Sequence, residues 1–156
     1  MGNMEDEGAN KRSSLSDRAG HSAMFDLLEH PADVKLRAWG ATLEQLFSNA
    51  AQGMMSYMFG ADIEKVRPER TDVIEVEAPD RDALLVDWLS ELLYRATSEY
   101  QAYVDFRIDE FSDRRLAARA GVASAEATDD IKAVTHHELS IREGDRGWEA
   151  TVVFDI

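Results

Sequence analysis

The residues of this chain that could do chemistry are mostly acidic. Asp33 ends a short polar stretch around Pro31, Asp155 is the second-last residue, and Ile156 contributes its main-chain carboxylate. Carboxylate oxygens suit calcium, magnesium and manganese, so three of them together would favour a hard divalent ion over zinc or copper. No short-range ligand motif links these positions, however, and an aspartate in an acidic protein is more often merely solvated. Their spacing alone therefore favours solvated side chains over a metal site.

Histidines and one lysine are the other candidates. His30 and Asp33 have a spacing that a zinc site could use. His136 and His137 are adjacent, so in a regular strand they point to opposite faces and cannot serve one site. Structural or surface histidines are commoner than ligands, and zinc is not favoured. Lys132 lies among apolar neighbours, where its amine either reaches past them to solvent or places a positive charge on the acidic site.

The motifs of common enzyme classes are missing. The sequence has no G-x-S-x-G, no phosphate-binding loop, no G-x-G-x-x-G and no H-E-x-x-H. Hydrolase, nucleotide-binding and zinc-protease functions therefore lack their best support. There is also no cysteine, which excludes disulfides, thiolate ligands and cysteine nucleophiles and is compatible with a reducing compartment.

Charge limits the partners that this chain can bind. It has 17 basic and 31 acidic residues, for a net charge of -14. Such an anion would be repelled by nucleic acids and by anionic membranes, so we expect no direct nucleic-acid or membrane binding. No segment approaches the ~18 to 20 apolar residues of a membrane span, so a soluble, cytoplasmic protein is expected. Its natural partners are cations, basic surfaces or other proteins.

The composition predicts one domain behind an N-terminal tail. Residues 1–22 mix Gly, Ser, Asn and charges of both signs with almost nothing to bury, which is typical of a mobile, disordered segment. Without them 14 basic and 27 acidic residues remain, so the acidity belongs to the folded part. Residues 23–156 fit a single compact domain by their length.

Two stretches have the periodicity of amphipathic helices. Their apolar residues recur at alternating steps of three and one, which places them on one helical stripe facing the core. Thr42 and Gln45 match a capping box ahead of the first stretch, and Asp80 can cap the second. We therefore expect helices near residues 42–58 and 80–98.

Alternating apolar and polar residues mark the strands. Segments with this period of two lie near residues 25–27, 34–38, 71–78, 104–108, 116–120, 131–135 and 148–156. The small, polar and acidic segment 121–130 predicts an exposed loop. Because each strand alternates, one sheet face should be open to water. The predicted fold is a two-layer α+β sandwich: a mixed, largely antiparallel sheet with the two amphipathic helices on one face. A functional site then belongs at strand ends or on the open face.

Four motifs in this order resemble one known family. They are LLEHPADVKLRAWGATLEQLFSNAAQGMMSYM, DALLVDWLSELLY, DIKAVTHHEL and, at the end, WEATVVFDI. The chain resembles the archease family from about Phe25 to Ile156. That resemblance implies an accessory protein without turnover of its own, a cofactor of RtcB-type RNA-splicing ligases, which join tRNA halves with GTP and a divalent metal. It would promote guanylylation of the ligase and keep it turning over.

The resemblance also implies site residues. The divalent ion, calcium or else magnesium or manganese, would be held by Asp33, Asp155 and Ile156, which reverses the preference for solvated side chains. Lys132 matches the lysine of the family's K-A-V-T motif, and Asp130 stands where an acidic residue usually precedes it. Together with His30, these two are the candidates for activating the partner.

Three departures and two alternatives accompany this hypothesis. The family more often has Thr at the position of Pro31 and an aromatic residue at that of His136, and its counterpart of the 121–130 loop is longer and often contains a histidine. One alternative is a metal-dependent phosphoesterase, in which the bound ion activates water. The other is a chaperone or interaction module that works through exposed apolar surface. The first lacks an evident general base, and the second conflicts with helices that use their apolar stripes internally.

Overall fold

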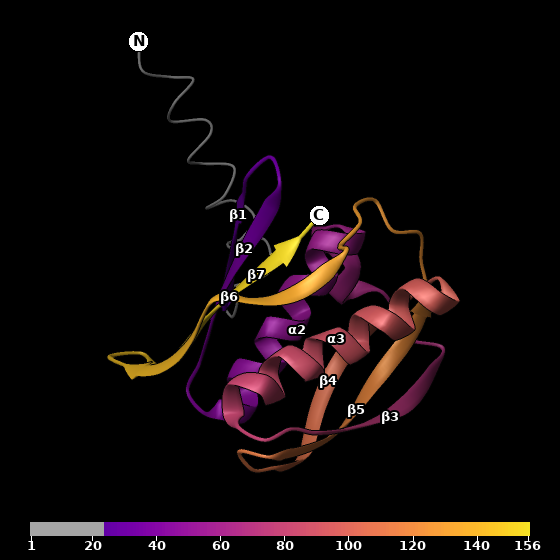
Figure 1. Ribbon diagram of the computed structural model, residues 1–156. Coiled ribbons are helices and arrows are strands. Elements are labelled where there is room, and N and C mark those ends of the chain that lie inside the picture. The colour runs from indigo at the N-terminus through magenta and orange to yellow at the C-terminus, as the bar shows by residue number, and fades with distance from the viewer. Residues whose placement is uncertain (1–23) are drawn as a thin grey trace.

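The computed structural model describes residues 24–156 (Figure 1). In chain order the elements are β1 (Phe25–Glu29), β2 (Asp33–Gly40), α2 (Leu43–Phe59), the 3-10 helix η1 (Ala61–Lys65), β3 (Arg70–Glu77), α3 (Arg81–Glu99), β4 (Gln101–Phe111), β5 (Arg115–Ser124), β6 (Ala133–Gly144) and β7 (Gly147–Asp155). The predicted tail, residues 1–22, lies outside the described residues and stays a prediction. No helix within residues 24–156 is long and apolar enough to cross a membrane.

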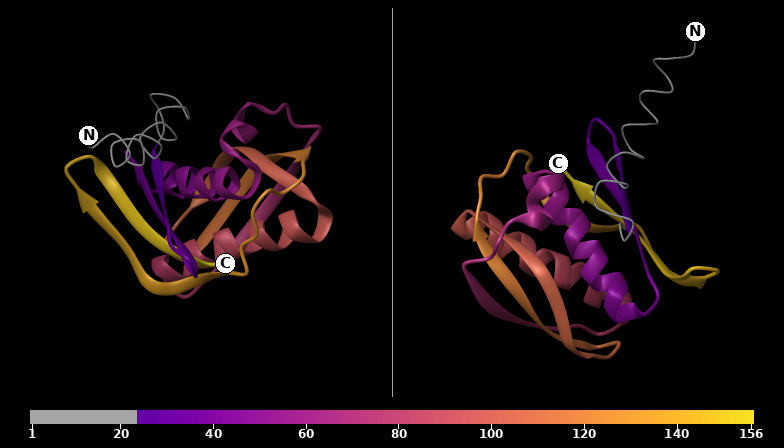
Figure 2. Two further views of the ribbon diagram at one scale, coloured as in Figure 1. Left: turned by 90° about the horizontal axis from the view of Figure 1, so that it is seen from above. Right: turned by 180° about the vertical axis from the view of Figure 1, so that it is seen from behind.

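The strands form two sheets. The first has the order β1-β2-β7-β6 and the second the order β3-β5-β4, with antiparallel pairing between all neighbours in the described chain. Helix α2 packs against β1 and β2 of the first sheet and β4 of the second, while α3 contacts β6 as well as β3 and β4. Figures 1 and 2 show the two sheets as separate layers with the helices packed against them. The α+β class is confirmed, and the strands are divided between two sheets.

Local capping explains where the helices begin. Thr42 Oγ1 accepts a hydrogen bond from the Gln45 N–H at 3.2 Å, and Gln45 Oε1 accepts one from the Ala41 N–H at 3.0 Å. These two bonds satisfy N–H groups that the start of a helix otherwise leaves free. Asp80 Oδ1 accepts from the Ala83 N–H at 2.8 Å in the same way. Both predicted helices are confirmed, each starting one residue after its cap.

The core lies where the helices meet the sheets. Trp88 of α3 is fully buried, and its indole Nε1–H donates to the Phe47 carbonyl of α2 at 3.0 Å. Met54, Met55 and Met58 are at most 1% exposed, so the methionine stripe of α2 is core and not an open groove. The apolar stripes of both helices are therefore used inside the domain.

The predicted loop over residues 121–130 is wrong in its first part. Strand β5 continues to Ser124, and Gly121, Val122 and Ala123 are buried in it. A Cβ at Gly121 would lie 2.6 Å from Cβ of Pro68, so a small residue marks close packing here and not exposure. The loop is confined to residues 125–132.

Candidate metal and partner site

Asp33 and Asp155 are directly opposed across two neighbouring strands. Asp33 begins β2 just after the β1–β2 turn, in which the His30 N–H donates to the Asp33 carbonyl at 2.9 Å. Asp155 ends β7, and the antiparallel register pairs it with Asp33 on one side and with Ala133 of β6 on the other. Asp33, Asp155 and the following residue, Ile156, therefore lie at one end of the four-stranded sheet. We call these three residues the carboxylate edge.

Strand alternation turns both aspartates away from the core. Their neighbours Val34 and Phe154 are fully buried and also pair with each other. Asp33 is half-buried and Asp155 is exposed. Both therefore lie on the face of the sheet that points away from the core. The prediction that Asp155 lies off the core face is confirmed.

Main-chain hydrogen bonds bring two further segments to the carboxylate edge. The Ile156 N–H donates to the Ala32 carbonyl at 3.4 Å, and the Lys132 N–H donates to the Asp155 carbonyl at 2.7 Å. Figure 1 shows the end of β7, the start of β6 and the β1–β2 turn at the same end of the molecule. Lys132 and His30, both exposed, thus belong to segments that border this edge.

The carboxylates of the edge have no cationic partner in the part of the chain that the structure describes. Neither Asp33 nor Asp155 makes an ion pair or a side-chain hydrogen bond there, while the nearby Lys35 pairs with Glu138 at 3.3 Å. Like charges directly opposite each other in a sheet are unfavourable. Two opposed, unpaired carboxylates therefore suit a cation from outside the chain.

The donor set fits a hard divalent ion only if the main chain takes part. Within residues 24–156 no three His, Asp or Glu side chains come together in a way that could hold a metal ion. The two aspartates offer two carboxylate groups, and the Ile156 N–H bond to the Ala32 carbonyl holds the last residue beside the β1–β2 turn, where its main-chain carboxylate would be the third oxygen group. An all-oxygen set of this kind suits calcium, magnesium or manganese.

The histidines of β6 do not form a zinc site in the described chain. His136 and His137 are both exposed, and the β6–β7 register is irregular between Thr135 and Ser140. His137 Nε2 lies 3.6 Å from Glu138 Oε2, and Glu138 has a positive φ of 54°. This stretch therefore departs from the regular strand that the sequence suggested.

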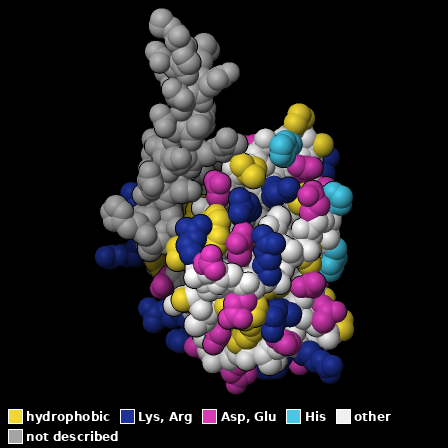
Figure 3. All heavy atoms as spheres, turned by 90° about the vertical axis from the view of Figure 1, so that its left-hand side faces the viewer, with side chains coloured by type: hydrophobic (Ala, Val, Ile, Leu, Met, Phe, Trp, Pro, Cys, Tyr) yellow, Lys and Arg dark blue, Asp and Glu magenta, His cyan; other side chains and the backbone are white. Residues whose placement is uncertain are grey.

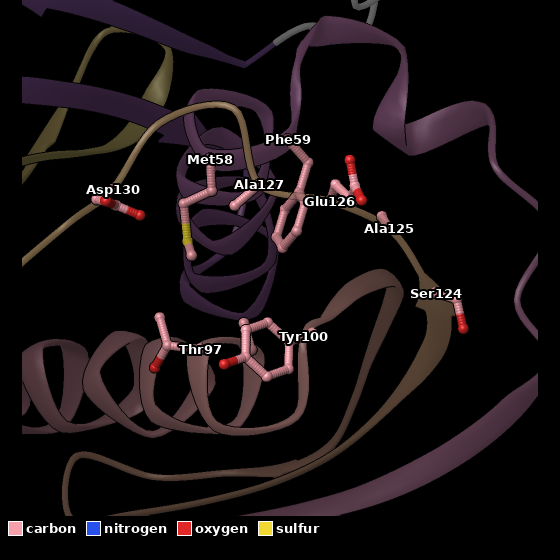
Figure 4. Close-up of a pocket in the computed structure, with 10 residues that line it drawn as sticks. Met58, Phe59, Thr97, Tyr100, Ser124, Ala125, Glu126, Ala127 and Asp130 are labelled. Carbon is pink, nitrogen blue, oxygen red and sulfur yellow. The ribbon is translucent and has the colours of Figure 1, made fainter.

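Asp130 is placed in a neighbouring pocket. This pocket has a volume of about 710 Å³ and is lined by Met58, Phe59, Tyr100 and the loop that carries Asp130, but by none of the edge residues (Figure 4). The loop is held on the end of α2, where the Met58 carbonyl accepts from the N–H groups of Thr128 at 2.7 Å and Asp129 at 3.2 Å. No local sequence signal identifies this pocket, because its walls come from segments far apart in the chain.

Negative charge surrounds this end of α2. Burial raises the pKa of Tyr57, and the charges of Asp129, Glu29 and Asp130 raise it further, in that order of importance. Each of these carboxylates disfavours a second negative charge on the phenolate. The 125–132 loop and the β1–β2 hairpin therefore share one anionic end of the domain.

These features define a small α+β protein whose distinctive chemistry is a carboxylate pair at a strand end. The chain belongs to the archease family: a match to the archease protein family covers residues 25–156. An archease protein of Methanosarcina barkeri is 35% identical over 141 residues, which cover 85% of this chain and 95% of the relative.

The similar solved structures include the following two. A Methanobacterium thermoautotrophicum protein determined in solution matches with a TM-score of 0.65 and 33% identity, over 86% of this chain and 99% of that one. A Thermotoga maritima crystal structure, described as an archease and possible chaperone, matches with a TM-score of 0.58 over 83% of this chain and 94% of that one. At 20% identity the second match shows the fold alone.

Proposed function

We propose that this protein is a non-enzymatic activator of an RtcB-type RNA-splicing ligase, and that it promotes the ligase's GTP- and metal-dependent guanylylation and turnover. The observation that carries the proposal is the direct pairing of Asp33 with Asp155, whose carboxylates have no partner within residues 24–156. A cation-binding site at the end of the sheet, with Asp155 exposed, suits a protein that acts on a partner. Family membership supports the same function.

In this proposal the carboxylates of Asp33, Asp155 and Ile156 hold a divalent ion. When bound, the ion supplies positive charge that can stabilise phosphate oxygens. The β2–β7 ladder fixes the two aspartates opposite each other, and the Ile156 N–H bond to Ala32 keeps the last residue beside them. Lys132, Asp130 and His30 are proposed to contact the partner, since they lie on the loop and turn near the edge.

Charge supports a basic partner. A protein with a net charge of -14 attracts a ligase that is basic because it binds RNA, and it gives no reason to expect RNA contact of its own. Acidic and basic side chains are interspersed on the face shown in Figure 3. The attraction to a basic ligase therefore comes from the net charge of the whole protein and from its anionic end. It does not come from a uniformly acidic surface.

The alternatives have less support. A phosphoesterase has to enclose its reacting water, whereas Asp155, Lys132 and His30 are all exposed. The Thermotoga relative is described as a possible chaperone. A chaperone that binds through apolar surface needs a contiguous patch, and in the described chain the large exposed apolar side chains are Val66, Val73, Tyr94 and Tyr100.

The test is ligase guanylylation with labelled GTP and limiting metal, with and without this protein. We expect the full chain to speed guanylylation, and Asp33→Asn and Asp155→Asn to lose that effect. Asp87→Asn is the matched control, because Asp87 is exposed on α3 and makes no ion pair with another described residue. Equal guanylylation rates with and without the wild-type protein would remove the proposed function.

A further inference from the structure

The pocket beside α2 combines a hydrophobic wall with negative charge. Its apolar lining includes Phe59 at the end of α2 and Tyr100 at the end of α3, and its acidic residues are Glu126 and Asp130. In Figure 4 the Phe59 ring extends from α2 towards the side of the pocket that carries Tyr100. At about 710 Å³ the pocket is as large as many small-ligand sites. It can therefore hold a group with both an apolar body and a charge.

The charge of the pocket is uncompensated. None of its ten lining residues is basic, and neither Glu126 nor Asp130 makes an ion pair or a side-chain hydrogen bond with another described residue. Helices α2 and α3 both end at this pocket, and neither has a basic residue in its last turn. Helix C-termini carry partial negative charge, so they add to the two carboxylates. Every charge in the lining favours a cation.

Tyr100 lies at the open side of the pocket and adds a second attraction for a cation. The residue ends α3 in the left-handed conformation, with φ of 55°, and is 83% exposed. Its ring therefore stands at the open side of the pocket. Aromatic faces attract cations, and guanidinium groups also stack on them.

We propose that this pocket binds an arginine side chain of a protein partner. The aliphatic arm would lie against Phe59 and Tyr100, and the guanidinium would lie on the Glu126 side of the pocket. Asp130, on the other side of the pocket in Figure 4, would add negative potential. A planar cation with a long apolar arm matches an aromatic and acidic lining better than a compact, strongly hydrated ion does. The pocket borders the anionic end of an acidic protein, which favours a basic protein segment as the occupant. This assignment does not depend on ligase activation.

The probe is a blocked tripeptide, acetyl-Gly-Arg-Leu-amide, titrated into the isotope-labelled full chain and followed by amide chemical shifts. We expect saturable shifts at residues 58–60, 96–100 and 124–130. The same peptide with citrulline in place of arginine keeps the shape and loses the charge, so it should bind at least about fivefold more weakly. Equal binding of both peptides would overturn the proposal.

Matched variants distinguish binding in the pocket from non-specific attraction of the peptide to an acidic protein. Glu126→Gln and Asp130→Asn should each weaken peptide binding about fivefold, whereas Glu143→Gln, the same change on the exposed β6–β7 hairpin, should not. Tyr100→Ala should weaken binding, whereas Tyr94→Ala, also on exposed α3 surface but outside the pocket lining, should not. Both tyrosines are exposed, so neither change opens a core cavity. An equal loss in the control variants would overturn the proposal.

n-Propylguanidinium distinguishes the source of the guanidinium, because it has the arginine side chain with the same single positive charge and without the peptide. If the occupant is part of a protein, n-propylguanidinium should bind more weakly than the tripeptide at the same ionic strength, since only the peptide adds main-chain and leucine contacts. Binding of n-propylguanidinium as tight as that of the peptide would assign the pocket to a free small cation and overturn the protein-partner assignment.

Discussion

Asp33 and Asp155 lie directly opposite each other in the β2–β7 ladder, and the next pair inward, Val34 and Phe154, is fully buried. The carboxylate pair is thus placed by the same alternation that builds the core. Changing the acids leaves the buried pair intact. This separation makes the metal proposal testable without unfolding the protein.

The first prediction concerns metal affinity. Asp33→Asn and Asp155→Asn should each abolish saturable calcium binding measured by calorimetry. Without metal, the free energy of unfolding should stay the same or rise by about 0.2–1 kcal/mol, because a like-charge pair is removed from directly opposed positions. Calcium titrations that are unchanged in both variants would reject the carboxylate edge as a metal site.

A feature of the fold or of the site could be predicted from the sequence where the residues that determine it lie close together in the chain. Thr42, Gln45 and Asp80 cap helices within a few residues of themselves, so both helices could be placed to within one residue. Alternation showed that Asp155 points off the core, but the β2–β7 register that brings it to Asp33 joins distant strands. Only the family resemblance suggested that partnership.

Long-range packing also explains which features the sequence did not predict. Gly121 looked like a loop residue, because a glycine in a polar stretch carries no sign that Pro68 packs where its Cβ would be. The division of the strands into two sheets depends on which strands pair, and alternation within one strand does not contain that information. The pocket joins Phe59, Tyr100 and Asp130, which share no sequence pattern.

The second prediction tests close packing in α2. A Cβ at Gly53 would lie 2.6 Å from Leu36 Cδ1 and 3.0 Å from Phe25 Cγ. Gly53→Ala should therefore destabilise the domain by about 1–3 kcal/mol, although alanine gains about 1 kcal/mol in helix propensity. Gly144→Ala, with no heavy atom within 4 Å of its Cβ, is the control and should change stability little. Urea unfolding of both variants measures the difference, and a more stable Gly53→Ala protein would contradict the packing.

The third prediction concerns Tyr103. Burial raises its pKa above the ordinary value of 10.0, and its hydrogen bond to Asp72, 3.1 Å long, raises it further. Because the pKa of an acid is raised on folding, this contribution to stability is present below pH 10 and is lost as pH rises through the folded-state pKa. Asp72→Asn should lower the pKa of Tyr103, as measured by phenolate absorbance. An unchanged titration curve in Asp72→Asn would show that the carboxylate does not act on this tyrosine.

The fourth prediction concerns docking on the ligase. Attraction between exposed opposite charges is screened over about 8 Å near physiological ionic strength, so activation should weaken as salt is added. The measurement is the guanylylation rate across a salt series, with the stability of the ligase checked at each point. A flat rate would mean that charge does not guide the encounter.

The last prediction concerns the main-chain carboxylate of Ile156. A main-chain carboxylate offers the same kind of oxygen atoms as an aspartate, so it can act as the third oxygen ligand. A short peptide extension after Ile156 would convert this carboxylate into an amide, remove its negative charge and place extra chain where ion and ligase should meet. The strand contacts would persist, because Phe154 and Val152 stay buried and the Ile156 N–H can still donate to Ala32. We therefore expect thermal stability without metal to change little, while calcium affinity and ligase activation collapse.

The same extension placed before residue 1 is the control and should leave calcium affinity and ligase activation intact. If the two extended proteins bind calcium and activate the ligase equally well, the Ile156 carboxylate is not a ligand, and Asp33 and Asp155 must act in another arrangement.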